Sequence, residues 1–237
     1  MNSFNPGGEH TAQSKVRGPA CFRVLGVDPA AAGPTGYGVV ESDGRNCQLL
    51  HYGALRVAAK RQNESLGAVL QDVHGLLCRL IEEYSPDALA VEGIFSALNV
   101  RTALRLAEVR GVVLLAAAQH QVQVHSYSPR EVKASVAGYG NADKRQMQMM
   151  VRALLRMTET PEPADAADAL AVALCHLQAQ QTRARYALPD SKNLVKPVSR
   201  RRNSAAAIAA TNATSLTAPL STRIATPAAG PRIVIPQ

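Results

Sequence analysis

The stretch FRVLGVDPAAAGPTGYGVVE, residues 22–41, decides the fold of this 237-residue chain. Its first part, Phe22–Asp28, is apolar up to a final aspartate, which predicts a buried strand. A loop rich in Ala, Gly and Pro follows, and Thr35–Glu41 predicts a second strand. A third strand is expected over Cys47–Val57, after a turn at Asp43–Gly44. Three strands in such close succession predict an antiparallel meander at the start of an α/β domain.

Helical and extended patterns alternate further along the chain. Ser65–Tyr84 has apolar residues at helical spacing, Asp87–Glu92 predicts a short strand, and Ala97–Gln119 predicts a long helix. The remaining expected elements are a strand over Val122–Tyr127, a short helix from Pro129, a helix over Ala142–Met157 capped by Asn141, and a helix over Ala164–Gln181. This order predicts an α/β fold with a mixed five-stranded sheet flanked by helices.

The two ends of the chain differ in composition from the middle. Residues 1–20 contain no apolar run of the kind found in a signal peptide. Residues 184–237 are first basic and then rich in Ala, Ser, Thr and Pro. We expect both ends to be disordered, and the folded domain to cover residues 21–183.

The formal net charge of +8 is distributed unevenly. Residues 187–237 carry +6, so residues 1–186 are nearly balanced at +2. Within that balanced part, the segment Arg101–Arg156 holds nine basic residues against three acids. A concentrated positive region is typical of a surface that contacts nucleic-acid phosphates, although a solvated helix face explains each single arginine equally well.

The cysteines and the apolar runs exclude other classes of protein. The four cysteines are far apart and form no Cys-x-x-Cys pair, so we expect reduced thiols rather than a disulfide scaffold or a zinc site. No uncharged apolar run reaches the ~18 residues that a membrane helix requires. The sequence therefore predicts a cytoplasmic protein without a membrane partner.

Four carboxylates occur where burial alone would not place them. Asp28 ends the first strand, and Glu92 ends the strand ALAVE. Asp165 and Asp168 lie in ADAADALAVAL, at the start of a helix that is otherwise rich in Ala and Leu. None of the four has a Lys or Arg three or four residues away. Strand ends and the first turn of a packed helix can converge, and four carboxylates at one point need a cation to stay ionised.

Carboxylate oxygens without His or Cys favour Mg²⁺ or Mn²⁺ over softer metals. Two such ions about 3.5 to 4 Å apart can activate a water molecule and stabilise the departing 3′-oxygen during attack on a phosphodiester. For each acid taken alone, a turn former or a helix cap is the ordinary alternative. Their joint occurrence at these positions favours a metal-dependent nuclease.

The chain resembles the RuvC-type Holliday junction resolvases, which are crossover junction endodeoxyribonucleases with a ribonuclease H-like fold. The matching stretches, between about residues 22 and 178, are VLGVDP with TGYGVVE, AVEGIFSALNVRTALRLAEVRGV, SPREVKASVAGYGNADKRQMQMMV and ADAADALAVAL. The resemblance implies a nuclease domain over residues 21–183. It also implies that four catalytic carboxylates bind two Mg²⁺ ions per subunit, which Mn²⁺ can replace: Asp28, Glu92, Asp165 and Asp168.

The resemblance further implies a homodimer that resolves four-way junction DNA by paired symmetric nicks, in homologous recombination and DNA repair. It implies cooperation with a branch-migration complex of the RuvA and RuvB type. Phe95 matches the family's aromatic residue that stacks at the junction, and Lys133 and Lys144 match its DNA-contacting lysines. Arginines of the same positive segment are further candidates for phosphate contacts: Arg101, Arg105, Arg130 and Arg145. For Arg105, an ion pair with Glu108 is the alternative.

Three other classes remain open from the residues alone. An actin-like or sugar-kinase ATPase would use the glycines between Gly33 and Gly38 as a phosphate loop, but Pro29 stands where a glycine should follow the aspartate. A catalytically idle junction-binding protein would not need four acids. Ribonuclease H activity on RNA/DNA hybrids shares the metal chemistry, and Phe95 with the segment Lys133–Arg145 favours junction DNA over it.

Overall fold

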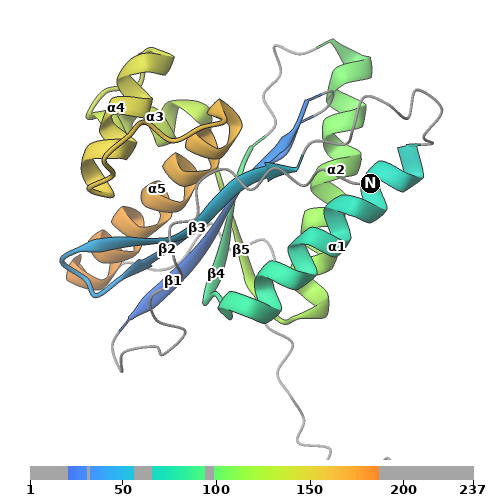
Figure 1. The fold of residues 1–237 in the computed structure, drawn as a ribbon, viewed down its shortest axis with the longest axis horizontal. Helices are drawn as coiled ribbons and strands as arrows, with labels where there is room; N and C mark the ends of the chain where they lie inside the picture. The colour runs from blue at the N-terminus through green and yellow to red at the C-terminus, as the bar shows by residue number, and fades with distance from the viewer. Residues whose placement is uncertain (1–20, 31–32, 56–65, 94–98, 187–237) are drawn as a thin grey trace, which may run out of the picture. The chain divides into compact units, whose positions relative to one another are not determined.

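The computed structural model describes residues 21–30, 33–55, 66–93 and 99–186, which form a five-stranded sheet with helices on both faces (Figure 1). The strands are β1 (Phe22–Asp28), β2 (Thr35–Ser42), β3 (Cys47–Leu55), β4 (Ala88–Glu92) and β5 (Gln123–Tyr127). The helices are α1 (Leu66–Tyr84), α2 (Val100–Gln119), α3 (Pro129–Ala137), α4 (Lys144–Leu154) and α5 (Ala164–Tyr186). The predicted fold class is confirmed.

The strands lie in the order β3-β2-β1-β4-β5. The first three form the predicted antiparallel meander, in which Asp28 pairs with Gly36 across β1 and β2. The pairs β1–β4 and β4–β5 are parallel, and Val27 of β1 lies opposite Val91 of β4. Because parallel strands end at the same edge of a sheet, Asp28 and Glu92 are the neighbouring last residues of β1 and β4.

Successive strand residues point to opposite faces of the sheet, and each face has its own core. Leu25 and Val91 pack in the core that α1 and α2 cover, whereas Val24 and Ala90 pack in the core that α5 covers. Figure 1 shows this division, with α1 and α2 on one side of the sheet and α3, α4 and α5 on the other. By the same alternation, the side chains at 28 and 92 project on the α5 face.

Helix α5 lies in backbone contact with the sheet because two glycines face it. A Cβ atom added to Gly36 would lie 1.9 Å from the carbonyl oxygen of Asp165, and one added to Gly26 would lie 2.1 Å from that of Ala169. The glycines therefore permit a close approach that any larger residue would block. Gly36 belongs to strand β2 under this helix, so the structure does not support the phosphate loop of the ATPase alternative.

The start of α4 differs from the sequence prediction. The helix covers Lys144–Leu154 rather than Ala142–Met157, and its cap is Asp143 rather than Asn141. The side chain of Asp143 accepts a hydrogen bond from the backbone N–H of Gln146 (2.8 Å), and the Gln146 side chain accepts one from the backbone N–H of Asp143 (2.9 Å). This reciprocal capping box satisfies two N–H groups and fixes the helix start there.

The predictions for residues 1–20, for residues 187–237 and for Phe95 lie outside the described ranges. In the part of the chain that the structure describes, α5 continues past the expected Gln181 to Tyr186. Among these same residues, no helix is both long enough and apolar enough to cross a membrane.

The contact of Gly36 with α5 predicts the effect of a single methyl group. Gly36→Ala should lower the free energy of unfolding by about 1 to 3 kcal/mol, because helix and strand must separate to admit the new Cβ. Gly75→Ala is the matched control, since its Cβ meets only the end of Arg79 at 3.5 Å in α1, and Ala is the better helix former by up to about 1 kcal/mol. Urea denaturation of both variants measures the difference, and equal stabilities would contradict the packing described here.

Candidate active site

The four predicted carboxylates come together where β1, β4 and α5 meet. Asp28 and Glu92 end adjacent parallel strands and share a side-chain hydrogen bond. Asp165 and Asp168 lie on the first turns of α5 and both act on Asp28 through space. All four residues are partly buried. The convergence of strand ends and a helix start, which the sequence predicts, is thus present in the fold.

Asp28 lies at the centre of this negative cluster. Burial, followed by the negative charges of Glu92, Asp168 and Asp165, raises the pKa of Asp28 to about 8. The hydrogen-bonded pair Asp28–Glu92 therefore retains a proton to a higher pH than isolated carboxyl groups do. A carboxyl group with such a raised pKa at the end of a strand is a functional-site candidate.

Two lysines partly offset the negative charge. Burial and then the charge of Asp168 raise the pKa of Glu92, while Lys133 opposes this rise. Burial also raises the pKa of Asp168, and Lys144 lowers it through an ion pair whose Nζ–Oδ2 distance is 3.5 Å. Lys133 comes from α3 and Lys144 from α4. The two lysines that the resemblance singles out thus lie directly beside the acids.

The lysines and two of the acids line one pocket of about 240 Å³. Its walls carry both charged and apolar side chains, and they come from the end of β4 and from α3, α4 and α5: Glu92, Pro129, Val132, Lys133, Lys144, Met147, Asp168, Ala171 and Val172. A pocket lined by both carboxylates and ammonium groups can bind a cation and a phosphate next to each other.

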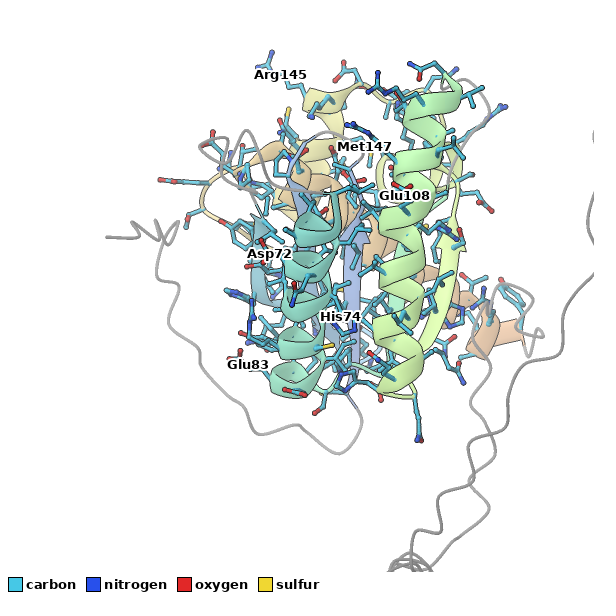
Figure 2. All side chains as sticks on the ribbon, turned by 90° about the vertical axis from the view of Figure 1, so that its right-hand side faces the viewer. Asp72, His74, Glu83, Glu108, Arg145 and Met147 are labelled. Atoms are coloured by element: carbon cyan, nitrogen blue, oxygen red, sulfur yellow. The ribbon has the colours of Figure 1, made fainter. Side chains whose placement is uncertain are left out.

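The predicted DNA-contacting arginines are more dispersed than the lysines. Arg130 on α3 packs against Gly140, and Arg145 on α4 lies exposed at the upper edge of the view in Figure 2. Arg101 and Arg105 are exposed on α2, which covers the other face of the sheet (Figure 1). None of these four arginines lines the pocket.

Arg110 is a residue of the site region that the sequence analysis did not single out. Its guanidinium donates to the carbonyl oxygen of Glu92 (2.9 Å) and to the hydroxyl of Ser126 (3.0 Å). In the sequence it is one of nine basic residues in the positive segment. No local feature of the sequence sets it apart from the other basic residues, because its partners, Glu92 and Ser126, lie far from it along the chain.

The side chains do not form a closed metal cage as they stand. Over the described ranges, no group of three or more His, Cys, Asp or Glu side chains is arranged so that it could hold a metal ion. The donors themselves are all carboxylate oxygens, and a proton shared by Asp28 and Glu92 lowers the charge of the cluster. In donor chemistry the site fits a hard divalent cation, which would take over the role of that proton.

Known proteins resemble this chain over most of the described domain. The family model described as "Crossover junction endodeoxyribonuclease RuvC" matches residues 24–176. The protein of that name from Chloroflexus aggregans is 49% identical over 166 residues, which cover 70% of this chain and 98% of the relative. Its counterpart from Alkaliphilus metalliredigens is 42% identical over 153 residues, covering 65% and 91%.

Solved structures agree with these relatives. RuvC of Thermus thermophilus in complex with a Holliday junction substrate matches with a TM-score of 0.65 and 31% identity, covering 73% of this chain and 99% of that one. The fold is that of a ribonuclease H-like nuclease. Within that class, the chain belongs to the RuvC family of crossover junction endodeoxyribonucleases.

The raised pKa of Asp28 predicts a stability that depends on pH. The folded state keeps this proton up to about pH 8, whereas the unfolded chain releases it near the ordinary value of 3.8. The free energy of unfolding therefore falls as the pH rises through this window. Asp28→Asn, which cannot ionise, should melt several degrees above the parent protein at pH 8 in EDTA, and the difference should shrink towards pH 4.

Asp43→Asn is the control for that experiment. The pKa of Asp43 is lowered by the backbone N–H groups of Asn46 and Arg45, so ionisation of this residue favours the folded state. Its amide variant should not gain stability at pH 8. Melting curves that show the same shift for both variants would refute the assignment of a buried, crowded carboxyl group at Asp28.

Proposed function

We propose that the chain is a magnesium-dependent endonuclease that resolves four-way DNA junctions by paired symmetric nicks. One observation carries the proposal: a cluster of four carboxylates centred on Asp28 lies beside a pocket that Lys133 and Lys144 line. The family membership supports it, and so does the Thermus thermophilus relative that was solved with a Holliday junction substrate. In this proposal the reaction belongs to homologous recombination and DNA repair in the cytoplasm.

The metal assignment rests on the donors at the end of β1, β4 and the start of α5. Asp28, Glu92, Asp165 and Asp168 would hold two Mg²⁺ ions per subunit, with Mn²⁺ as a substitute, because hard oxygen ligands suit both ions. Bound there, the ions supply a Lewis acid that activates the attacking water and stabilises the leaving oxygen. The residues themselves concentrate negative charge at one partly buried point.

The positive groups near the acids have a separate task in this proposal. Lys133 and Lys144 bind the phosphates beside the bond that is cut, because both line the pocket. Residues further from the pocket extend the phosphate contacts along the junction arms: Arg101, Arg105, Arg130 and Arg145. Phe95, which lies outside the described residues, stacks on a junction base by analogy with the family.

A homodimer would set the symmetry of the two nicks. The outward side of α2 carries an exposed stripe at positions 104, 108, 111 and 115, and Leu104 and Leu115 on it are 61% and 52% exposed. A Cβ on Gly111 would meet nothing within 4 Å, so a second helix can approach closely there. Figure 2 views this side of the molecule, with Glu108 labelled on α2. We propose that two copies pair through α2, and that the dimer works with a branch-migration complex of the RuvA and RuvB type.

The deciding experiment offers the protein a synthetic four-way junction, a linear duplex of the same sequence and an RNA/DNA hybrid, each with Mg²⁺, Mn²⁺ or EDTA. We expect paired symmetric nicks on the junction alone, in the presence of either metal. Asp28→Asn should keep junction binding and lose cleavage by at least about a hundredfold, because binding rests on the cations and cutting on the acids.

Three results would revise this assignment in different ways. Cutting of the hybrid in place of the junction would keep the metal chemistry and replace the substrate. Binding without cutting would make the chain a junction-binding protein. Normal cleavage by Asp28→Asn would show that Asp28 is not a metal ligand.

The α2 interface predicts a monomeric variant. Leu115→Lys should halve the mass that analytical ultracentrifugation measures, because two buried ammonium groups at a two-fold interface repel each other and lose hydration. Met149→Lys introduces the same charge at a similarly exposed position, 56%, on α4, and should remain a dimer. Equal masses for the two variants would place the interface elsewhere.

A further inference from the structure

Arg110 ties helix α2 to the ends of two strands. Its Nη1 donates to the carbonyl oxygen of Glu92 in β4, and its Nη2 donates to the hydroxyl of Ser126 in β5. The guanidinium is half-buried, and this burial lowers the pKa of Arg110, although an arginine stays charged at physiological pH. Both terminal nitrogens are thus engaged with protein acceptors at the edge of the sheet.

The carbonyl that Arg110 holds lies beyond the last pairing of β4 with β1. The β1–β4 register ends at Val27 opposite Val91, one residue before Glu92. On the other side, Glu92 pairs with Tyr127 of β5, and the N–H of Gly93 donates to the Tyr127 carbonyl oxygen (2.8 Å). Arg110 therefore supplies a fixed contact where the sheet no longer supplies one on the β1 side.

Glu92 is contacted by elements on both faces of the sheet. Its carboxylate lies on the α5 side, within the electrostatic reach of Asp168 and hydrogen-bonded to Asp28. Its carbonyl oxygen accepts from Arg110 of α2, which covers the other face. A shift of the strand end would move this carboxylate relative to the acids of β1 and α5.

We propose that Arg110 is a positioning residue, which holds the end of β4 so that the Glu92 carboxylate stays in place to complete the metal-binding site. This inference rests on the proposed function, because it presumes that Glu92 is a ligand. The planar fork of arginine reaches a carbonyl and a hydroxyl at once, and the single ammonium of a lysine cannot reproduce both contacts. Arg110 acts through Glu92 and touches neither the substrate nor the metal.

The test is Arg110→Lys, studied first without DNA. The loss of the free-ion signal in electron paramagnetic resonance measures how much Mn²⁺ the protein binds. The affinity for Mn²⁺ should fall about 10- to 100-fold, as is typical when a residue that orients a metal ligand is lost. Junction cleavage should need a correspondingly higher Mn²⁺ concentration. Melting temperature and junction binding in EDTA should match those of the parent protein.

Two further variants separate positioning from general effects. Ser126→Ala removes one acceptor and leaves the bond to Glu92, so its loss of Mn²⁺ affinity should be smaller than that of Arg110→Lys. Arg79→Lys makes the same exchange on the exposed side of α1 and should bind Mn²⁺ as the parent does.

Each outcome has a distinct meaning. Parent-like Mn²⁺ binding by Arg110→Lys overturns the inference and leaves the proposed function intact. A parallel fall in melting temperature, junction binding and Mn²⁺ affinity also overturns it, because Arg110 would then serve the fold as a whole. Failure of the parent protein itself to bind Mn²⁺ refutes the proposed function instead.

Discussion

The contact between α5 and the first two strands is the constraint on which the site depends. Gly26 and Gly36 carry no Cβ, so the helix backbone rests on the strands, with carbonyl oxygens where side-chain atoms would otherwise lie. This contact brings Asp165 beside Gly36, which is the pairing partner of Asp28. If a side chain separated α5 from β1 and β2, the acids of α5 would lie too far from those of β1 and β4 to act as one group.

The same closeness makes the site electrostatically unfavourable in the absence of a cation. Burial and mutual repulsion raise the pKa of Asp28, Glu92 and Asp168, and Lys133 and Lys144 compensate only in part. Stability is thus given up at the place where the proposed function locates the chemistry. Such local conflict is expected at functional sites, where the rest of the fold must hold groups together that would separate on their own.

Periodicity and position predict much of this fold, and long-range contacts account for the rest. Asp28 ends an apolar strand, and the rule that parallel strands end together predicts that it meets another strand-end acid. Asn141 and Asp143 are both acceptable helix caps, and only the reciprocal bonds with Gln146 decide between them. From the sequence alone, Gly36 is as compatible with a loop as with a close contact between a strand and a helix. The bond from Arg110 to a carbonyl 18 residues away has no local signature.

The ion pair between Lys144 and Asp168 has a thermodynamic consequence. Lys144 is one of the cations that line the pocket, and Asp168 is one of its acids, with Nζ and Oδ2 at 3.5 Å. An anion that draws Lys144 away leaves the charge of Asp168 less compensated, and a cation that binds Asp168 releases Lys144. By reciprocal linkage, each ligand raises the affinity for the other by the same factor. Loading of the two kinds of ligand is therefore cooperative.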